Sequence, residues 1–272
     1  YLAAEALRRT CDVIMTTGAQ QSNHARQTAG AAARLGLDCT LVLGGEPPAA
    51  AQGNYLLDRF FGAEVRWAGD RPLLDALSAE AAALRRTGRR PFVVPYGGSN
   101  GLGGCGFVEG FLEITQQAHA HDLDFDAIVI ASSSGGTQAG LTVGAHALGS
   151  PTRIVGISIA ERSPALRRHL AEFAAQISAR LNLEIDLGPD AFATVDDYLG
   201  GGYGVVSALE RQAIHTLART EGLLADPVYT GRALGALIDL IRNGAFDCDE
   251  RVLFWHTGGS PSLYAYAEAL LR

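Results

Sequence analysis

The sequence contains no lysine, and all 22 of its residues counted as lysine or arginine are arginine. None of these 272 residues can therefore offer a lysine amine to form an imine with an aldehyde cofactor. Codon bias that exchanges lysine for arginine on a surface would leave the same composition. The absence alone therefore excludes one chemistry and no particular function.

Positive net charge, long apolar runs and paired cysteines are also missing. The net charge is −7 and the isoelectric point is near 5.5, whereas nucleic-acid-binding surfaces are usually basic. No apolar run approaches the ~18 residues of a membrane span, and no signal peptide opens the chain. The cysteines are scattered, without the spacing of a zinc site or a disulfide framework. We expect a cytoplasmic protein with reduced thiols and with neither nucleic acid nor membrane as partner.

Short apolar runs alternate with amphipathic stretches along the whole chain, which is 47% hydrophobic and can bury a large core. The runs predict strands at residues 12–17, 39–43, 63–67, 91–94, 127–131, 153–158 and 251–256. The amphipathic stretches predict helices at residues 2–9, 22–35, 52–61, 72–87, 107–121, 137–148, 164–181, 206–221, 230–243 and 261–271. This alternation is typical of an α/β protein with parallel sheets covered by helices on both faces.

Glycine-rich stretches suggest where the chain is divided. Five glycines crowd into residues 95–104, and we place a domain junction there. The predicted domains are a smaller α/β domain, residues 1–104, and a larger one, residues 105–272. A second irregular stretch, residues 183–205, ends in glycines that indicate either a flexible connector or a close approach to a ligand.

Residues 16–27 join a predicted strand to an alanine-rich helix. Gly18 breaks the strand, and Ser22, Asn23 and His24 then fall at or near the helix N-terminus. Free backbone N–H groups and the helix dipole favour an anionic ligand at such a position. Ser22 or Asn23 could also serve only as the helix cap, which is an ordinary use of these residue types.

A second polar turn, Ser132-Ser133-Ser134-Gly135-Gly136-Thr137, follows a predicted buried strand and precedes a helix. Small residues let the backbone approach an anion, and successive N–H groups and hydroxyls can donate hydrogen bonds to it. The turn lacks both the Gly-Lys-Ser/Thr ending of a Walker loop and the G-x-G-x-x-G spacing of a dinucleotide site. It is a candidate phosphate cradle, although a turn without a ligand could have the same composition.

Two further junctions carry polar residues before or after glycine. Residues 225–231 place Tyr229 just before a predicted helix, where it could transfer a proton or simply pack. Residues 253–260 form the other junction, at the end of a predicted strand. Because ligands of open parallel sheets gather at the carboxyl ends of the strands, several such junctions together indicate one binding site.

Metal and hydrolase chemistry are disfavoured. His24 and His256 are candidate metal ligands, and Ser22 with His24 is a candidate nucleophile and base. Neither spacing is typical of a metal site or a catalytic triad, and the chain has no H-E-x-x-H motif. We expect no metal.

Taken together, the junctions resemble the pyridoxal-phosphate enzymes of the 1-aminocyclopropane-1-carboxylate deaminase and D-cysteine desulfhydrase family. The resemblance runs through essentially the whole chain, with matching spacing. It is carried by Thr17-Gly18-Ala19 with Gln21-Ser22-Asn23-His24, Ser134-Gly135-Gly136-Thr137-Gln138-Ala139-Gly140, Thr220-Glu221-Gly222 with Asp226-Pro227-Val228-Tyr229, and His256-Thr257-Gly258-Gly259. It implies the tryptophan-synthase-β-like fold (fold type II), with two open, twisted, mostly parallel sheets flanked by helices, and a larger cofactor domain.

The resemblance also assigns residues to the cofactor, pyridoxal 5′-phosphate. The phosphate would be held by Ser134, Gly135, Gly136 and Thr137. Asn23 would hydrogen-bond the ring hydroxyl, and Thr257 would meet the pyridine nitrogen. A neutral hydroxyl leaves that nitrogen less firmly protonated than a carboxylate would, which moderates the electron sink.

The substrate implied is a small amino acid, bound by Gln21, Ser22, Asn23 and His24. Ser22 matches the family's catalytic serine beside the substrate carboxylate, and Tyr229 and Tyr203 match the tyrosines that face the substrate. The resemblance also implies a homodimer.

Three positions favour the D-cysteine desulfhydrase side of the family. Enzymes that open the cyclopropane ring resemble one another in having Glu and Leu where this chain has Thr230 and Thr257, and more often Gln at His24. We therefore expect α,β-elimination on D-cysteine, giving pyruvate, ammonia and sulfide. A cyclopropane-carboxylate deaminase and an L-cysteate lyase are the alternatives within the family.

The lysine that binds the cofactor in this family belongs in a Gly-Asn-Lys segment a few residues before Tyr1. We expect that segment in the intact protein, upstream of the supplied residues. The alternative from another class is a lysine-free homologue that binds a ligand without catalysis. A dinucleotide-dependent oxidoreductase is disfavoured, because the turn at residues 132–137 lacks the required glycine spacing.

Overall fold

The computed structural model describes residues 1–271 and divides into two compact units, Tyr1–Gly98 and Ser99–Arg272. Helix α5 (Gly101–His119) begins the second unit, so the boundary predicted after Gly104 falls inside this helix. Asn100 caps the helix, and its Oδ1 accepts the Gly103 N–H at 2.8 Å. Part of the glycine-rich stretch predicted as a junction is therefore the first turn of a helix.

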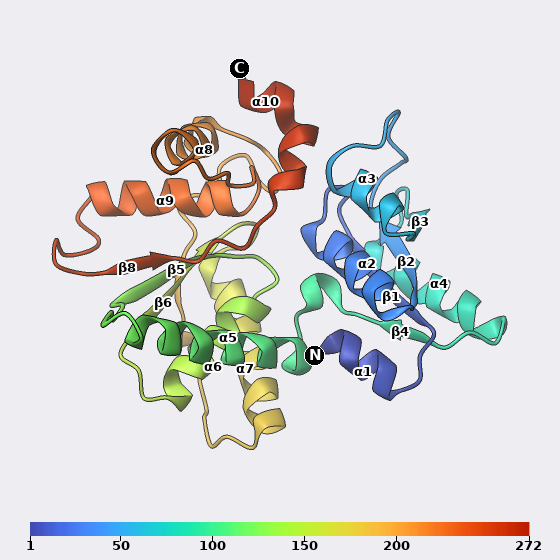
Figure 1. The fold of residues 1–272 in the computed structure, drawn as a ribbon, viewed down its shortest axis with the longest axis horizontal. Coiled ribbons are helices and arrows are strands. Elements are labelled where there is room, and N and C mark those ends of the chain that lie inside the picture. The colour runs from blue at the N-terminus through green and yellow to red at the C-terminus, as the bar shows by residue number, and fades with distance from the viewer. Residues whose placement is uncertain (272) are drawn as a thin grey trace. The chain divides into compact units, whose positions relative to one another are not determined.

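The first unit is built on one four-stranded parallel sheet in the order β3-β2-β1-β4 (Figure 1). Its strands are β1 (Val13–Gly18), β2 (Asp38–Leu43), β3 (Glu64–Trp67) and β4 (Pro91–Val93). Its helices are α1 (Leu2–Arg8), α2 (Asn23–Leu35), α3 (Gly53–Phe60), α4 (Leu73–Arg86) and the short 3-10 turn η1 (Tyr96–Gly98).

Strand β1 is buried on both faces, as its uninterrupted apolar run predicts. Ile14 points to the side covered by α2 and packs in a cluster with Ala25 and Ala29. Val13 and Met15 point to the opposite side and pack with residues of α4. The period of two along the strand thus supplies two separate core layers.

The second unit is also built on a four-stranded parallel sheet, in the order β7-β6-β5-β8. Its strands are β5 (Ala127–Ser132), β6 (Arg153–Ser158), β7 (Ala193–Val195) and β8 (Val252–Phe254). Besides α5, its helices are α6 (Gly136–Ala147), α7 (Ser163–Leu181), α8 (Ala208–Glu221), α9 (Thr230–Arg242) and α10 (Ala267–Leu271), with 3-10 turns η2 (Pro189–Ala191) and η3 (Ser260–Tyr266).

Helices cover both faces of this second sheet, with α8 and α9 on one side and α5 and α6 on the other (Figure 1). The side chains of strand β5 likewise alternate between two core layers, one on each face of the sheet. Ile128 and Ile130 pack with Phe111 and Leu141 of α5 and α6, whereas Val129 packs with α9. The α5–α6 contact is close because glycines line it: a Cβ on Gly140 would lie 2.4 Å from the Gly104 carbonyl oxygen.

The predicted fold class, with two parallel sheets flanked by helices, is confirmed. Strand β7 was not predicted, because it is only three residues long and lies in the irregular stretch 183–205. Helix α5 begins six residues earlier than predicted, since Asn100 caps it despite its glycines. The last predicted helix, residues 261–271, is largely the 3-10 turn η3, followed by the short α10.

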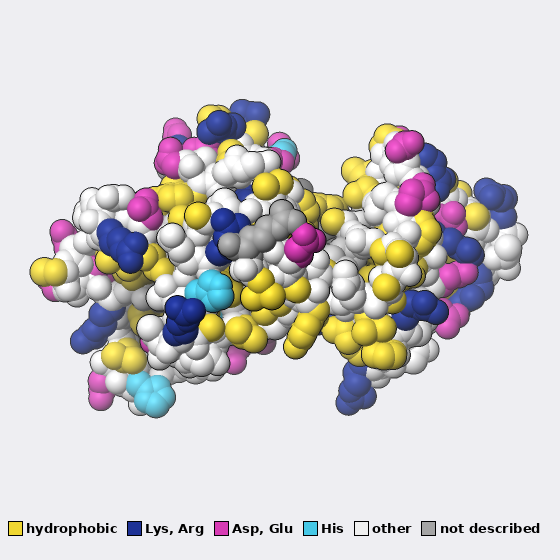
Figure 2. All heavy atoms as spheres, turned by 90° about the horizontal axis from the view of Figure 1, so that it is seen from above, with side chains coloured by type: hydrophobic (Ala, Val, Ile, Leu, Met, Phe, Trp, Pro, Cys, Tyr) yellow, Lys and Arg dark blue, Asp and Glu magenta, His cyan; other side chains and the backbone are white. Residues whose placement is uncertain are grey.

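Charged side chains of both signs are mixed on one face of the protein (Figure 2). On the face drawn in Figure 2, arginine side chains lie interspersed with acidic ones among the described residues. Within residues 1–271, no helix has both the length and the apolar character that crossing a bilayer requires.

Candidate functional site

Each sheet reverses its strand order once, and the predicted site residues follow the strands at those points. In the first unit the reversal lies between β1 and β4, and in the second between β5 and β8. Open parallel sheets bind ligands outside the carboxyl ends of the strands at such a reversal. The polar segments at residues 18–24 and 132–137 follow β1 and β5, and residues 255–259 follow β8. Each unit therefore carries part of the predicted site at the edge of its own sheet.

Ser22 is the N-cap of α2, as the capping interpretation of the sequence expects. Its Oγ accepts the Ala25 N–H at 3.1 Å, and its residue is only 7% exposed. Gly18 makes room for it, because a Cβ there would lie 2.5 Å from the Ser22 Oγ. The cap uses Ser22 as an acceptor, and its hydroxyl proton is left to donate elsewhere.

A fully buried amide, Asn54 at the start of α3, holds the neighbouring polar residues in place. Its Nδ2 donates to the Gln21 carbonyl oxygen at 2.9 Å and to the Asn23 Oδ1 at 2.7 Å. Its backbone N–H donates to the Gln21 Oε1, and the Gln21 Nε2 donates to the Gln52 carbonyl oxygen. The Gln21 amide is thus used at both ends to hold the 52–54 loop, while Asn23 keeps its Nδ2 donors for another partner.

His24 lies against the end of β1. Its Nε2 is 2.8 Å from the Thr16 Oγ1, which in turn donates to the Val94 carbonyl oxygen at 3.0 Å. Burial lowers the pKa of His24 to about 4, partly offset by a hydrogen bond to the Pro95 backbone. The ring is therefore neutral at physiological pH.

The turn at residues 132–137 has the features of an anion cradle. Gly135 is the N-cap of the 12-residue helix α6 with φ +88°, and because it has no side chain it makes no capping hydrogen bond to the first turn. The Ser132 Oγ is buried and has no hydrogen-bond partner among the described residues. Ser134 and Thr137 are half-buried hydroxyls in the same turn. N–H groups at a helix start, spare hydroxyls and the absence of an acidic residue in the first turn fit a phosphate.

Ser99 holds this turn in place through two hydrogen bonds. Its Oγ donates to the Ser134 Oγ at 2.8 Å and accepts the Gly136 N–H at 3.1 Å. A Cβ on Gly136 would lie 2.6 Å from that Oγ, so only glycine fits there. The small residues of the turn are thus required by close packing as well as by access to an anion.

Residues 97–106 contain two motif spacings that point to other chemistries, and the structure shows why neither applies. Ser99 sits in a G-x-S-x-G spacing, but no histidine is among the hydrogen-bond partners described for its Oγ within residues 1–271. Residues 101–106 have G-x-G-x-x-G spacing, but they form the first turns of α5. There, a Cβ on Gly104 would lie 2.3 Å from Ile177, so this glycine serves close packing between helices.

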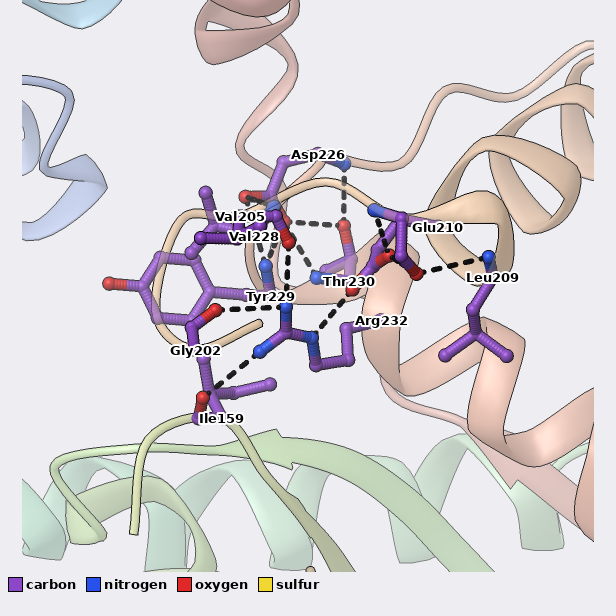
Figure 3. A network of polar contacts seen from close by, with 11 residues as sticks. Ile159, Gly202, Val205, Leu209, Glu210, Asp226, Val228, Tyr229, Thr230 and Arg232 are labelled. Atoms are coloured by element: carbon purple, nitrogen blue, oxygen red, sulfur yellow. Dashed lines mark hydrogen bonds and ion pairs between the residues drawn. The ribbon is translucent and has the colours of Figure 1, made fainter. Parts of the chain in front are cut away.

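The two predicted tyrosines meet in the second unit. The Tyr203 and Tyr229 hydroxyl oxygens are 2.6 Å apart, and their rings pack edge to face at 5.9 Å. Asp226, which is fully buried, fixes the turn before α9 (Figure 3). It accepts the Tyr229 N–H at 3.2 Å and the Thr230 N–H at 2.6 Å. Burial raises the pKa of Asp226 despite these hydrogen bonds.

Thr230 supports the same turn and is 1% exposed. Its Oγ1 lies 2.8 Å from the Asp226 Oδ1 and 2.7 Å from the Asp226 backbone nitrogen. One of the three residues that distinguish the two branches of the resemblance therefore contacts Asp226, which fixes the turn that carries Tyr229.

Thr257 is exposed in the loop after β8, and a histidine shapes that loop. The His256 Nδ1 accepts the Gly258 N–H at 3.0 Å, and the Nε2 lies 3.0 Å from the Leu224 carbonyl oxygen. Because Nδ1 is an acceptor, the proton is on Nε2 and is donated to Leu224. His256 thus links the loop of Thr257 to the segment before Tyr229, and both nitrogens of its ring have protein partners. Within residues 1–271, no group of three or more His, Cys, Asp or Glu residues is arranged to hold a metal ion.

Comparison with known proteins gives this geometry a family. A model described as "Pyridoxal-phosphate dependent enzyme" matches residues 1–258. The chain belongs to the pyridoxal-phosphate-dependent enzymes. The D-cysteine desulfhydrase of Yersinia enterocolitica is 40% identical over 283 residues, covering 98% of this chain and 82% of the relative. The resemblance seen in the sequence is therefore confirmed, and with it the cofactor, pyridoxal 5′-phosphate.

Solved structures agree with this assignment. A crystal structure described as an ACC deaminase homologue superposes with a TM-score of 0.91 at 36% identity, covering all of this chain and 81% of the other. A threonine deaminase from T.th., at 18% identity and a TM-score of 0.62, covers 95% of this chain and 81% of its own length. That more distant likeness shows the shared fold alone, which is fold type II.

Proposed function

We propose that this enzyme catalyses α,β-elimination of D-cysteine, releasing pyruvate, ammonia and sulfide. The observation that carries the proposal is the 40% identity to a D-cysteine desulfhydrase across 98% of the chain. A second relative of the same name, from Salmonella choleraesuis, is also 40% identical over 276 residues. The anion cradle at residues 132–137 supports the part of the proposal that concerns the cofactor, because it suits a phosphate.

The cofactor supplies an electron sink for the negative charge that develops at the substrate α-carbon. Its phosphate would be held by Ser134, Gly135, Gly136 and Thr137. Asn23 would donate from its Nδ2 to the ring hydroxyl oxygen, because its Oδ1 already accepts from Asn54. Thr257 would present its hydroxyl to the pyridine nitrogen.

The remaining site residues act on the substrate. Ser22 would donate its hydroxyl proton to the substrate carboxylate, beside the first-turn N–H groups of α2. The neutral ring of His24, at the same helix end, adds no charge beside that carboxylate. Tyr229 would donate its hydroxyl proton to the departing sulfur, and Tyr203, 2.6 Å away, would hold that hydroxyl in place.

A cyclopropane-carboxylate deaminase is the second candidate, and the TM-score of 0.91 to an ACC deaminase homologue favours it. Thr230 and Thr257 oppose it, since ring-opening enzymes resemble one another in Glu and Leu at these positions. An L-cysteate lyase is the remaining candidate of the same class.

Turnover assays separate these candidates. The gene product containing these 272 residues, loaded with pyridoxal 5′-phosphate, is given D-cysteine, L-cysteine, 1-aminocyclopropane-1-carboxylate or L-cysteate. We expect sulfide and pyruvate from D-cysteine well above the other three. Turnover of 1-aminocyclopropane-1-carboxylate alone would replace the proposal with the deaminase.

The same preparation tests for a lysine-free binding protein. None of the 272 residues is lysine, so the amine that holds the cofactor in this family must be sought in the gene product. Borohydride reduction followed by peptide mass spectrometry should find the cofactor on a lysine in a Gly-Asn-Lys context. Cofactor binding without attachment and without turnover would favour a non-catalytic homologue.

We also propose that the enzyme is a cytoplasmic homodimer. The four free cysteines, Cys11, Cys39, Cys105 and Cys248, suit a reducing compartment. The dimer rests on the family resemblance. Sedimentation of the purified protein should give twice the monomer mass, and a monomer at micromolar concentration would contradict it.

A further inference from the structure

Arg232, on the first turn of α9, is completely buried and uses its guanidinium to join three segments of the second unit (Figure 3). Its Nε donates to the Glu210 Oε1 at 2.6 Å, and its Nη1 donates to the Ile159 carbonyl oxygen at 3.1 Å. Its Nη2 donates to the carbonyl oxygens of Gly202, at 3.1 Å, and Val205, at 2.9 Å. The planar fork of arginine reaches these acceptors from one side chain, which the single ammonium of lysine does not match.

The two carbonyls held by the Nη2 are the ends of the turn that carries Tyr203. The Val205 N–H donates to the Gly202 carbonyl oxygen at 3.3 Å and closes the turn. Gly202 and Gly204 adopt φ +104° and +74°, values that side-chain-bearing residues rarely adopt. A turn with glycine on either side of its tyrosine has little local stiffness, so its shape depends on the groups that hold its ends.

The helix that carries Arg232 also begins immediately after Tyr229. One side chain therefore connects the turn of Tyr203 to the helix start beside Tyr229. With both segments held, the Tyr203 and Tyr229 hydroxyl oxygens lie 2.6 Å apart and the two rings pack edge to face. Because a proton relay needs its oxygens within hydrogen-bond distance, holding this turn has a chemical consequence.

Glu210 keeps the buried cation paired. It is 1% exposed, and its other oxygen accepts from the Ser207 N–H at 2.7 Å and from the Ser207 hydroxyl at 2.5 Å. Burial alone would raise the pKa of Glu210, but hydrogen bonds from Ser207 and Arg232 lower it, so the carboxylate is charged. A paired charge with its hydrogen bonds satisfied is a rigid anchor for the turn.

We propose that Arg232 is a positioning residue, which holds the Gly202–Val205 turn so that the Tyr203 hydroxyl stays on the Tyr229 hydroxyl. It would contact neither the substrate nor the cofactor, and would act through Tyr203. The catalytic consequence rests on the proposed function, in which the two tyrosines face the substrate. The structural part, the link from Arg232 to the tyrosine pair, stands without it.

Arg232→Lys keeps the charge beside Glu210 and removes the fork. Arg167→Lys is the matched control, since the Arg167 Nε also donates to one group in this unit, the Thr194 Oγ1 at 2.9 Å, away from the turn. The first readouts need no substrate. They are amide hydrogen exchange at Val205 and the NMR signals of the two tyrosine rings, assigned with Tyr203→Phe and Tyr229→Phe.

We expect Arg232→Lys to speed exchange at Val205 by at least about tenfold and to shift both ring signals, while Arg167→Lys changes neither. In the holoenzyme, Arg232→Lys should lower kcat with D-cysteine about 10- to 100-fold, with a smaller change in KM. In a Tyr203→Phe background it should lower kcat less than about twofold further, because both changes remove the same contact.

Unchanged ring signals and exchange in a folded Arg232→Lys protein would overturn the proposal, and so would a full additional loss of kcat in the Tyr203→Phe background. If Arg232→Lys fails to fold, Gly202→Ala strains the same turn, at φ +104° with open space around its Cβ, and leaves the buried pair intact. It should shift the same ring signals, and no shift would count against the proposal. Shifted signals in a protein inactive on D-cysteine would refute the substrate and keep the positioning role.

Discussion

Two carboxylates are equally buried, one in each unit, and their surroundings shift their pKa values in opposite directions. Asp58 on α3 and Glu210 on α8 are each 1% exposed. Neither oxygen of Asp58 has a hydrogen-bond partner among residues 1–271, whereas both oxygens of Glu210 accept hydrogen bonds. Burial raises the pKa of Asp58 to about 7, while the donors around Glu210 hold its pKa below the usual value. Donors, and not depth, decide whether a buried carboxyl stays charged.

The arginine near each carboxylate explains the difference. Arg232 donates its Nε directly to Glu210. Arg26 instead donates its Nε to the Asn54 Oδ1 at 3.3 Å and lowers the pKa of Asp58 only through its charge. The first unit thus uses its arginine to support the Asn54 amide that holds Asn23, and leaves Asp58 to take up a proton.

The largest effect on stability should come from removing the carboxylate that pairs with Arg232. Glu210→Gln leaves the Arg232 cation buried without its counter-charge, and we expect a loss of about 3–5 kcal/mol in the free energy of unfolding. Urea denaturation measures it. A loss below about 1 kcal/mol would show that water or another group neutralises Arg232.

Removing the charge of Asp58 should have the opposite effect on the free energy of unfolding. Asp58 has a folded-state pKa raised from 3.8 to about 7, so the folded state binds its proton more tightly than the unfolded state does. Stability contributed by this proton is full at low pH and is lost as the pH rises through about 7. Asp58→Asn removes the ionisation, and above pH 7 we expect it to stabilise the fold by about 2–4 kcal/mol.

The same comparison at low pH is the control for this variant. Well below the ordinary pKa of 3.8, Asp58 is protonated in both states, so Asp58→Asn should be nearly neutral there. Equal stabilisation at that low pH and at about pH 8 would show that the gain has another source than ionisation.

Asn54→Ala tests the uncharged hydrogen bonds that the buried Asn54 amide makes in the first unit. It removes both Nδ2 hydrogen bonds and leaves the Gln21 carbonyl and Asn23 Oδ1 without a donor, which should cost about 1–3 kcal/mol. Because no ionisable group is lost, the change should depend on pH much less than that of Asp58→Asn. Equilibrium dialysis should also show weaker cofactor binding, since the Asn23 amide is no longer held in one orientation. Unchanged affinity would contradict the proposed hydrogen bond between Asn23 and the cofactor.

The features that could be predicted from the sequence are those that local sequence determines. Apolar runs such as residues 127–131 are buried on both faces whatever surrounds them, and Ser22 caps its helix through a contact three residues away. The short strand β7 carries too few residues for a periodic signal. Asn54 and Arg232 lie outside every motif, and their partners are 22 to 73 residues away in sequence. Such contacts depend on how distant segments pack, which no local pattern encodes.

The smallest effect concerns His24, whose titration runs against that of Asp58 within the same unit. Burial lowers the pKa of His24 from 6.5 to about 4, so the unfolded state binds its proton more readily. Stability contributed by the neutral ring is therefore full above pH 6.5 and is lost as the pH falls through about 4. For this half-buried ring we expect about 1–2 kcal/mol.

Between about pH 4 and 7 the two contributions oppose each other, since one is lost on acidification and the other on raising the pH. His24→Gln should therefore make stability fall more steeply as the pH rises, because Asp58 is left alone. Asp58→Asn should make it fall more steeply on acidification, and the double variant should follow neither slope. Urea midpoints of the four proteins across this range measure these differences. Parallel curves for wild type and His24→Gln would mean that His24 is protonated equally in both states.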